Sequence, residues 1–343
     1  MINFSEATLS RLAIHQVGNK SSDQGLKLSD AEVALNGEVR DILNHYFTKP
    51  FRQSEMFNFY HDAGLQFNEV YSFVKGVFKS PESLLDQSLL IAKHLYEQSD
   101  HPNIKDGELY VAFLENCRMD NFDYSAVGIF KSEQKETYLK VYPEGRNFQV
   151  SHDNGININK LDKGCLILNS NEEGGYIVLT VDNTNKEEAQ YWRKGFLGVK
   201  PLEDAYFNTK NYLQLCRDFA VEAFPEADRL DQMSLIQESA KYFKEEETFD
   251  KAKFREKVLQ EPELIQAFDD YKQEYENKGN FRIEDEFDIN SDAVKKMSKV
   301  FKSIIKLDRN FHIYVHGNRN LIRKGFDEES GMGFYQLFYK EES

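Results

Sequence analysis

The spacing of apolar residues changes from a period of two to a period of 3.6 partway along this 343-residue chain, and that change limits its fold. Residues 108–118 and 123–131 alternate apolar and polar side chains, and the short link between them predicts antiparallel neighbours. Residues 174–181 are mostly apolar, as in a strand that is buried on both faces or nearly so. From about residue 186 the spacing becomes helical. The sequence therefore predicts an α+β protein.

Helices are predicted between the strands of the first part. Residues 38–47 place Val39, Ile42, Leu43 and Tyr46 on one face. Residues 67–78 form a short helix, and Pro81 begins a longer one. The remaining predicted strands are 9–17, 137–142 and 164–169. We expect a mixed or antiparallel sheet with helices packed on it.

The second part is predicted to be mainly helical. Its helices span residues 206–223, 231–244 and 261–277, and a short β-meander follows from residue 301. In the first helix one apolar stripe contains Tyr212, Leu215, Phe219 and Val221. The change of pattern near 198–201 predicts an α+β domain over residues 1–200 and a helical domain with a C-terminal β-hairpin or meander over residues 201–343.

The chain is strongly acidic, with a net charge of −15. Proteins that coat DNA with their whole surface are basic, so this balance argues against that class. A DNA-binding protein of this composition has to gather its cations in one place.

One segment near the C-terminus does gather them. Residues 295–324 hold nine basic residues and one acidic residue, a net charge of +8 that leaves −23 for the rest of the chain. We predict that this segment contacts DNA, because phosphates attract cations and a tyrosine can lie against sugar or base. The predicted contacts are Lys295, Lys296, Lys299, Lys302, Lys306, Arg309, Tyr314, Arg319, Arg323 and Lys324.

The spacing of these residues predicts their arrangement. Lys295, Lys299, Lys302 and Lys306 would form one stripe on a helix that extends that far. Residues 311–316 alternate, and Gly317-Asn318 is typical of a two-residue hairpin turn. A hairpin closed there would add Arg319, Leu321 and Arg323 to the face of His312, Tyr314 and His316.

Two other interpretations of the basic segment stay open. Lysine faces on helices are usually solvated surface. The cations could also pair with the acidic stretch 284–286 or with another subunit.

Catalytic motifs give little support to an enzyme, and we predict no catalytic residue, metal site or cofactor. His312 and His316 would lie about 13 Å apart on a strand that rises ~3.3 Å per residue. Glu133-Gln134-Lys135, with Asp120 or Asp123 upstream, loosely resembles a metal-dependent nuclease site. A polar surface hairpin explains that triplet better. Cys165, Trp192 and His15 are predicted to be core residues.

The remaining features predict a cytoplasmic protein that does not span a membrane. The start of the chain lacks a leader-like pattern, and no apolar run approaches the ~18 residues of a membrane span. Cys117, Cys165 and Cys216 are widely spaced, which favours free thiols in a reducing compartment.

Three stretches, taken in order, resemble the NdpA/YejK-like family of bacterial nucleoid-associated proteins. The first is Ala13–Lys20, and the second is Gly155–Lys160 running on to Cys165–Leu168. The third is Gln190–Gly198, followed by Lys200 and the helix with Tyr212 and Phe219. The resemblance covers roughly the first 220 residues.

The resemblance implies association with the bacterial chromosome, binding of double-stranded DNA and no established catalysis. It identifies no DNA-contacting residue. Binding through phosphate contacts of the basic segment would give little sequence preference. The acidity of the chain leaves two alternatives: an interaction module that docks on a chromosome-processing protein, or a metal-dependent nuclease. Homo-oligomers are compatible with each of these.

Overall fold

Nine strands of the first part form one antiparallel sheet. The computed structural model describes residues 2–51, 55–183, 191–223, 229–298, 303–315 and 321–341. The strand order is β11-β4-β10-β9-β6-β5-β2-β3, with β1 beside β5. These strands are β1 (Ile2–Asn3), β2 (Thr8–Val17), β3 (Leu26–Lys27), β4 (Met56–Phe59), β5 (Gly107–Met119), β6 (Phe122–Ser132), β9 (Lys163–Leu168), β10 (Ile177–Asp182) and β11 (Val199–Pro201).

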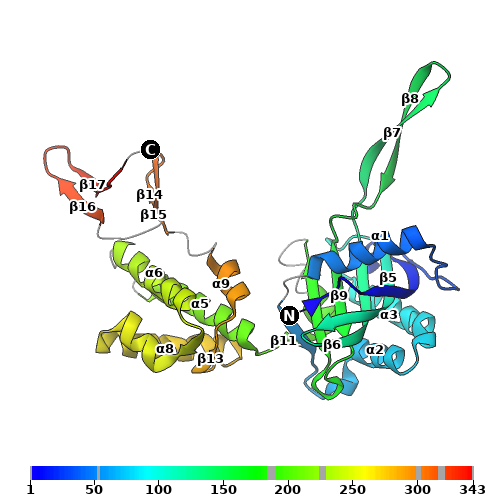
Figure 1. Ribbon diagram of the computed structural model, residues 1–343, viewed down its shortest axis with the longest axis horizontal. Helices are drawn as coiled ribbons and strands as arrows, with labels where there is room; N and C mark the ends of the chain where they lie inside the picture. Colours follow the sequence, from blue (N-terminus) through cyan, green and yellow to red (C-terminus); the bar gives the residue numbers. More distant parts are fainter. Residues whose placement is uncertain are drawn as a thin grey trace. The chain divides into compact units, whose positions relative to one another are not determined.

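Both faces of this sheet are buried. Leu109, Val111 and Phe113 of β5 point into one apolar cluster, and the residues between them point into the other. Helices α2 (Glu69–Lys79) and α3 (Leu84–Gln98) cover the first face. Helix α1 (Gly37–Thr48) covers the second (Figure 1). The predicted helices and the predicted pairing of β5 with β6 are therefore confirmed.

Some predicted details of this part are wrong. Val39 and Ile42 of α1 are exposed, so only part of the expected apolar face packs on the sheet. Strand β10 begins at Ile177 rather than at residue 174. Gly175 lies in a turn with φ +91°, and a Cβ there would meet the carbonyl oxygen of Phe59 at 2.4 Å. That close approach requires glycine, and the turn places the start of β10 after it.

Asn68 joins three backbone segments through one side chain. Its Oδ1 accepts the N–H of Tyr71 at 2.9 Å and so caps α2. Its Nδ2 donates to the carbonyls of Tyr60, Leu197 and Gly198 at 3.2, 2.9 and 3.0 Å. The segment that contains Trp192 is thereby held against the start of α2.

Strand β7 (Glu136–Glu144) pairs with β8 (Asn147–Gly155) instead of joining the large sheet. The two form a hairpin that projects from the sheet (Figure 1). The sequence predicted a strand at 137–142 but did not predict β8.

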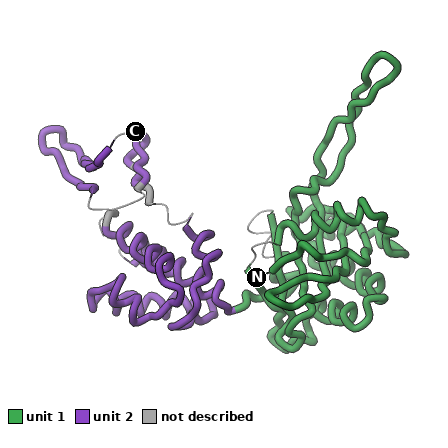
Figure 2. The backbone as a smooth tube through the Cα atoms, in the orientation of Figure 1, with its two compact units in different colours: residues 1–202 green, residues 203–343 purple. Residues whose placement is uncertain are grey.

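The chain divides after Leu202 into unit 1, residues 1–202, and unit 2, residues 203–343 (Figure 2). Unit 2 contains α5 (Ala205–Glu222), α6 (Arg229–Glu245), α7 (Lys251–Phe254), α8 (Pro262–Gly279) and α9 (Ser291–Ser298). A small sheet pairs β12 (Thr248–Asp250) with β13 (Glu286–Asp288). Tyr212, Leu215 and Phe219 of α5 are buried, but Val221 is exposed, so it does not belong to the predicted stripe.

The C-terminal strands form two separate hairpins. Strand β14 (Ser303–Leu307) pairs with β15 (Phe311–Val315), and β16 (Ile322–Asp327) pairs with β17 (Met332–Leu337). A small apolar cluster joins both hairpins to Met233 of α6. Its other members are Ile305, Leu307, Ile313, Ile322 and Tyr335.

Candidate nucleic-acid interface

The predicted lysine stripe on one long helix does not form. The described part of helix α9 runs to Ser298, and Lys306 lies on strand β14 opposite His312. The β-branched residues Ile304 and Ile305 favour a strand there, and pairing with β15 stabilises it. Lys299 and Lys302 lie outside the described residues.

Lys295 and Lys296 occupy the last turn of α9, where the helix dipole favours cations. Both side chains are exposed. The ammonium of Lys295 lies 3.1 Å from Asp292 Oδ1, and that of Lys296 lies 5.9 Å from the ring centre of Tyr206. Surface ion pairs of this kind contribute little to stability, so Lys295 can exchange its contact with Asp292 for one with a phosphate at small cost.

Arg309 and Tyr314 are exposed on the first hairpin. Arg309 is part of the turn between β14 and β15, and Tyr314 is on β15. The prediction of a β15–β16 hairpin is wrong, because the described residues of β15 pair with β14 and those of β16 pair with β17. Residues 316–320, which include Arg319 and the expected turn, lie outside the described residues.

Arg323 and Lys324 are exposed on the second hairpin. As successive residues of β16 they point to opposite faces. The guanidinium of Arg323 lies 5.2 Å from the ring centre of Phe338. Leu321 and Arg323 therefore do not extend the face of His312 and Tyr314 as predicted.

The candidate residues lie on elements that share one support. Helix α9 packs against α5 and α6, and both hairpins meet α6 through the cluster around Met233 and Ile305. We call the exposed surface of α9 and these hairpins the C-terminal basic surface. Its described members are Lys295, Lys296, Arg309, Tyr314, Arg323 and Lys324.

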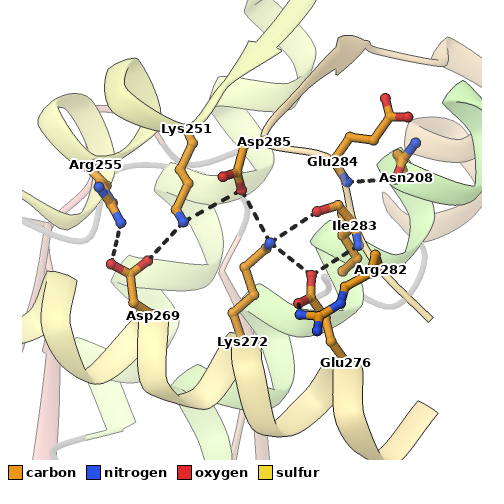
Figure 3. Close-up of polar contacts among 10 residues, drawn as sticks. All are labelled: Asn208, Lys251, Arg255, Asp269, Lys272, Glu276, Arg282, Ile283, Glu284 and Asp285. Carbon is orange, nitrogen blue, oxygen red and sulfur yellow. Dashed lines mark hydrogen bonds and ion pairs between the residues drawn. The ribbon is translucent and has the colours of Figure 1, made fainter. Parts of the chain in front are cut away.

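Asp285, in the acidic stretch 284–286, is held by lysines from other parts of unit 2 (Figure 3). Asp285 lies 3.2 Å from Lys272 of α8 and 3.5 Å from Lys251 of α7. Burial opposes ionisation of Asp285, but these lysines outweigh it and hold its pKa below the ordinary value. Lys272 also contacts Glu276 at 2.8 Å and donates to the carbonyl of Ile283. This network fixes the segment before β13 to α8.

Glu133 is buried, so the prediction that its triplet lies on a surface hairpin is wrong for this residue. Its carboxylate lies between Lys131 and Lys163, at 3.0 and 2.7 Å, and both lysine side chains are inaccessible to solvent. Burial lowers the pKa of Lys131, while Glu133 acts against that shift. Asp162 accepts the N–H groups of Glu133 and Gln134 at 2.8 and 3.0 Å.

The acids of the nuclease alternative are not gathered in one place. Asp123 lies near the start of β6 and forms an ion pair with Arg118, whereas Glu133 follows the end of that strand. Lys135 pairs with Glu108 at 2.6 Å. Among the described residues, no three His, Cys, Asp or Glu side chains are placed to hold a metal ion.

The residues predicted to be core residues are buried. His15 Nε2 lies 2.8 Å from Ser88 Oγ, and Nδ1 accepts the N–H of Ser29 at 3.2 Å. Burial lowers the pKa of His15 and raises the pKa of the Cys165 thiol. Trp192 packs in the apolar cluster that lies between the sheet and helices α2 and α3.

The comparisons with known proteins identify the family. No curated protein matches the chain. No helix of the described residues is both long enough and apolar enough to cross a membrane. A family model described as nucleoid-associated protein YejK matches residues 13–331, which include nearly all of both units. The chain therefore belongs to the family of the nucleoid-associated protein YejK.

Proposed function

We propose that this chain binds double-stranded DNA through the C-terminal basic surface, without catalysis and with little sequence preference. The observation that carries the proposal is the charge of residues 295–324, which is +8 in a chain of −15. The described part of that segment lies on elements that share α6 as their support. Membership of a nucleoid-associated family gives independent support for a place at the chromosome.

The chemistry of this surface fits the DNA backbone. Lysine and arginine on a helix end and on hairpins contact phosphates and release counterions, which gives affinity without sequence information. Tyr314, which is exposed on the same hairpin as Arg309, can lie against a sugar or a base. Lys299, Lys302, Lys306 and Arg319 belong to the proposed set by their sequence position.

A charge reversal on described residues tests the proposal. The triple variant Arg309→Glu, Arg323→Glu, Lys324→Glu should weaken binding of a fluorescent duplex. It should also make the negative slope of log affinity against log salt shallower, by up to about 3. The matched control reverses three exposed lysines of unit 1, Lys27, Lys79 and Lys93. Both variants change the net charge equally, so a loss confined to the first identifies the surface.

Two outcomes would overturn the proposal. Equal losses in both variants would show that overall charge, and not this surface, governs binding. A wild-type chain that leaves naked DNA unbound at physiological salt would favour the acidic interaction module that docks on a chromosome-processing protein. Duplexes of unrelated sequence should bind with similar affinity.

A further inference from the structure

The hairpin of β7 and β8, residues 136–155, leaves the body of unit 1 as an arm (Figure 1). In the part of the chain that the structure describes, each of its strands pairs with the other and joins no further sheet. A two-stranded hairpin alone in water is marginally stable. The arm therefore needs another source of stability, and its side chains indicate which one.

One face of the arm is apolar and open to solvent. Leu139, Val141, Phe148 and Val150 are 71%, 63%, 73% and 64% exposed. Val141 is opposite Val150 in the register, Pro143 is opposite Phe148, and Leu139 is opposite His152. Directly opposite residues share a face, so the five apolar side chains form one strip, with His152 beside Leu139 at its end nearer the base of the arm.

The other face is polar, and its contacts are made within the arm. Lys140 lies 2.8 Å from Asp153, and Tyr142 donates to Gln149 at 3.0 Å. The Lys140 ammonium also lies 5.7 Å from the ring centre of Tyr138. The apolar strip is thus the face that gains from a partner, since burial of large exposed apolar side chains is favourable.

We infer that two copies of this chain associate through their arms, with the apolar strip of one arm against that of the other. Charge favours a second copy at this place. The arm contains Lys140 and Arg146 against Glu136, Glu144 and Asp153, a net charge of −1, whereas the whole chain carries −15. The arm is therefore a place where two acidic molecules meet with little repulsion.

The same charge argument sets the direction of the arms. Antiparallel arms, tip to base, keep the two acidic bodies at opposite ends, whereas parallel arms would bring them together. A two-fold axis at Val141 places Val141 of one copy on Val141 of the other and Leu139 near Pro143. Pro143 has no N–H to offer to an added strand, which favours contact by the faces over extension of the β7 edge.

The size of the strip sets the expected strength. Nine residues at ~3.3 Å make an arm about 30 Å long and, with two strands, about 10 Å wide. Pairing two such faces with their flanks buries on the order of 1,000 Å² in total, the lower limit of specific interfaces. We expect a reversible dimer that dissociates in the micromolar range.

Sedimentation velocity of the full chain over a series of concentrations tests the association. Leu139→Ser with Phe148→Ser should weaken the dimer at least tenfold. The matched control, Tyr138→Ser with Tyr142→Ser, removes two exposed large side chains from the opposite face and should leave the dimer intact. A wild-type chain that stays monomeric, or equal losses in both variants, would overturn the inference.

Cysteine cross-linking tests the antiparallel arrangement without disturbing the fold. The three native cysteines are buried, so an introduced thiol on the arm is the reactive one. With copper–phenanthroline as oxidant, Val141→Cys should form a disulfide between two copies, and Arg146→Cys at the tip should not. The reverse pattern, or no cross-link in either variant, would contradict the arrangement.

Discussion

The two units bury different kinds of side chain. Unit 1 covers both faces of its sheet with mainly aliphatic residues and also encloses the charged group Lys131, Glu133 and Lys163. Unit 2 is organised around the ring of Tyr212, which lies within 6.3 Å of five phenylalanine rings. Unit 2 also buries the ion pair of Lys272 with Glu276, whereas other pairs, such as Lys251 with Asp285, remain partly exposed.

This difference shows where each unit is sensitive to change. A buried charge that loses its partner is costly, so unit 1 depends on single polar residues. In unit 2 the weakest attachment is the small apolar cluster that joins the C-terminal hairpins to α6. The proposed DNA contacts thus lie on the part of unit 2 with the least apolar support.

The largest expected effect is that of Glu133→Gln. This change leaves two buried lysines without their shared carboxylate, so the free energy of unfolding of unit 1 should fall by about 3–5 kcal/mol. Urea denaturation followed by circular dichroism measures the change. Glu173→Gln on the surface should stay within about 0.5 kcal/mol of the wild type. A loss no greater than that of the control would show that the Glu133 carboxylate does not stabilise the two buried lysines.

A smaller, local effect is expected from Ile305→Ala in unit 2. Removing this buried side chain should cost about 2 kcal/mol and release the hairpins from α6, while the helical core stays folded. Hydrogen exchange should quicken in residues 303–315 and 321–337 and remain unchanged in α5 and α8. Phe311→Ala, at an exposed position of the same hairpin, is the control. Cooperative loss of the helices would contradict the separation of hairpins and core.

The smallest effect concerns pH and His15. The neutral ring fits its site because Nδ1 accepts an N–H, and burial lowers the pKa of the group. The unfolded chain therefore binds an extra proton below about pH 6.5, so unit 1 should lose stability as the pH falls through that value and keep it above. His15→Gln should flatten this dependence, whereas His45→Gln at an exposed position of α1 should preserve it. An unchanged slope in His15→Gln would assign the dependence to other groups.

Long regular segments were predictable from the sequence, and short or locally paired ones were not. Strands β5 and β6 and helix α5 have enough residues to show their periods. Strand β4 has four residues, too few to define a period, and β8 is rich in polar residues because it packs only against β7. Pairing with the distant strands β10 and β11 determined β4, and pairing with the neighbouring strand β7 determined β8.

The candidate site was predicted less well, because charge spacing is weak evidence for secondary structure. Lysines at helical intervals indicated one helix over 295–306, yet Ile304 and Ile305 belong to a strand. Glu133 was misjudged because its polar neighbours indicated a turn, while its partner Lys163 is remote in sequence. A lysine within the apolar strand β9 was the signal that could have revealed that burial.

Asn68 has a chemical consequence for the ageing of this molecule. Hydrolysis of its amide to a carboxylate would keep the cap on α2 but direct a negative charge at three carbonyl oxygens that now accept hydrogen bonds. The Trp192 segment would then lose the hydrogen bonds from Asn68 and keep those that Tyr60 N–H donates to Gly198 and His94 donates to Phe196. Deamidation of this one side chain should therefore destabilise unit 1 more than most substitutions on its surface.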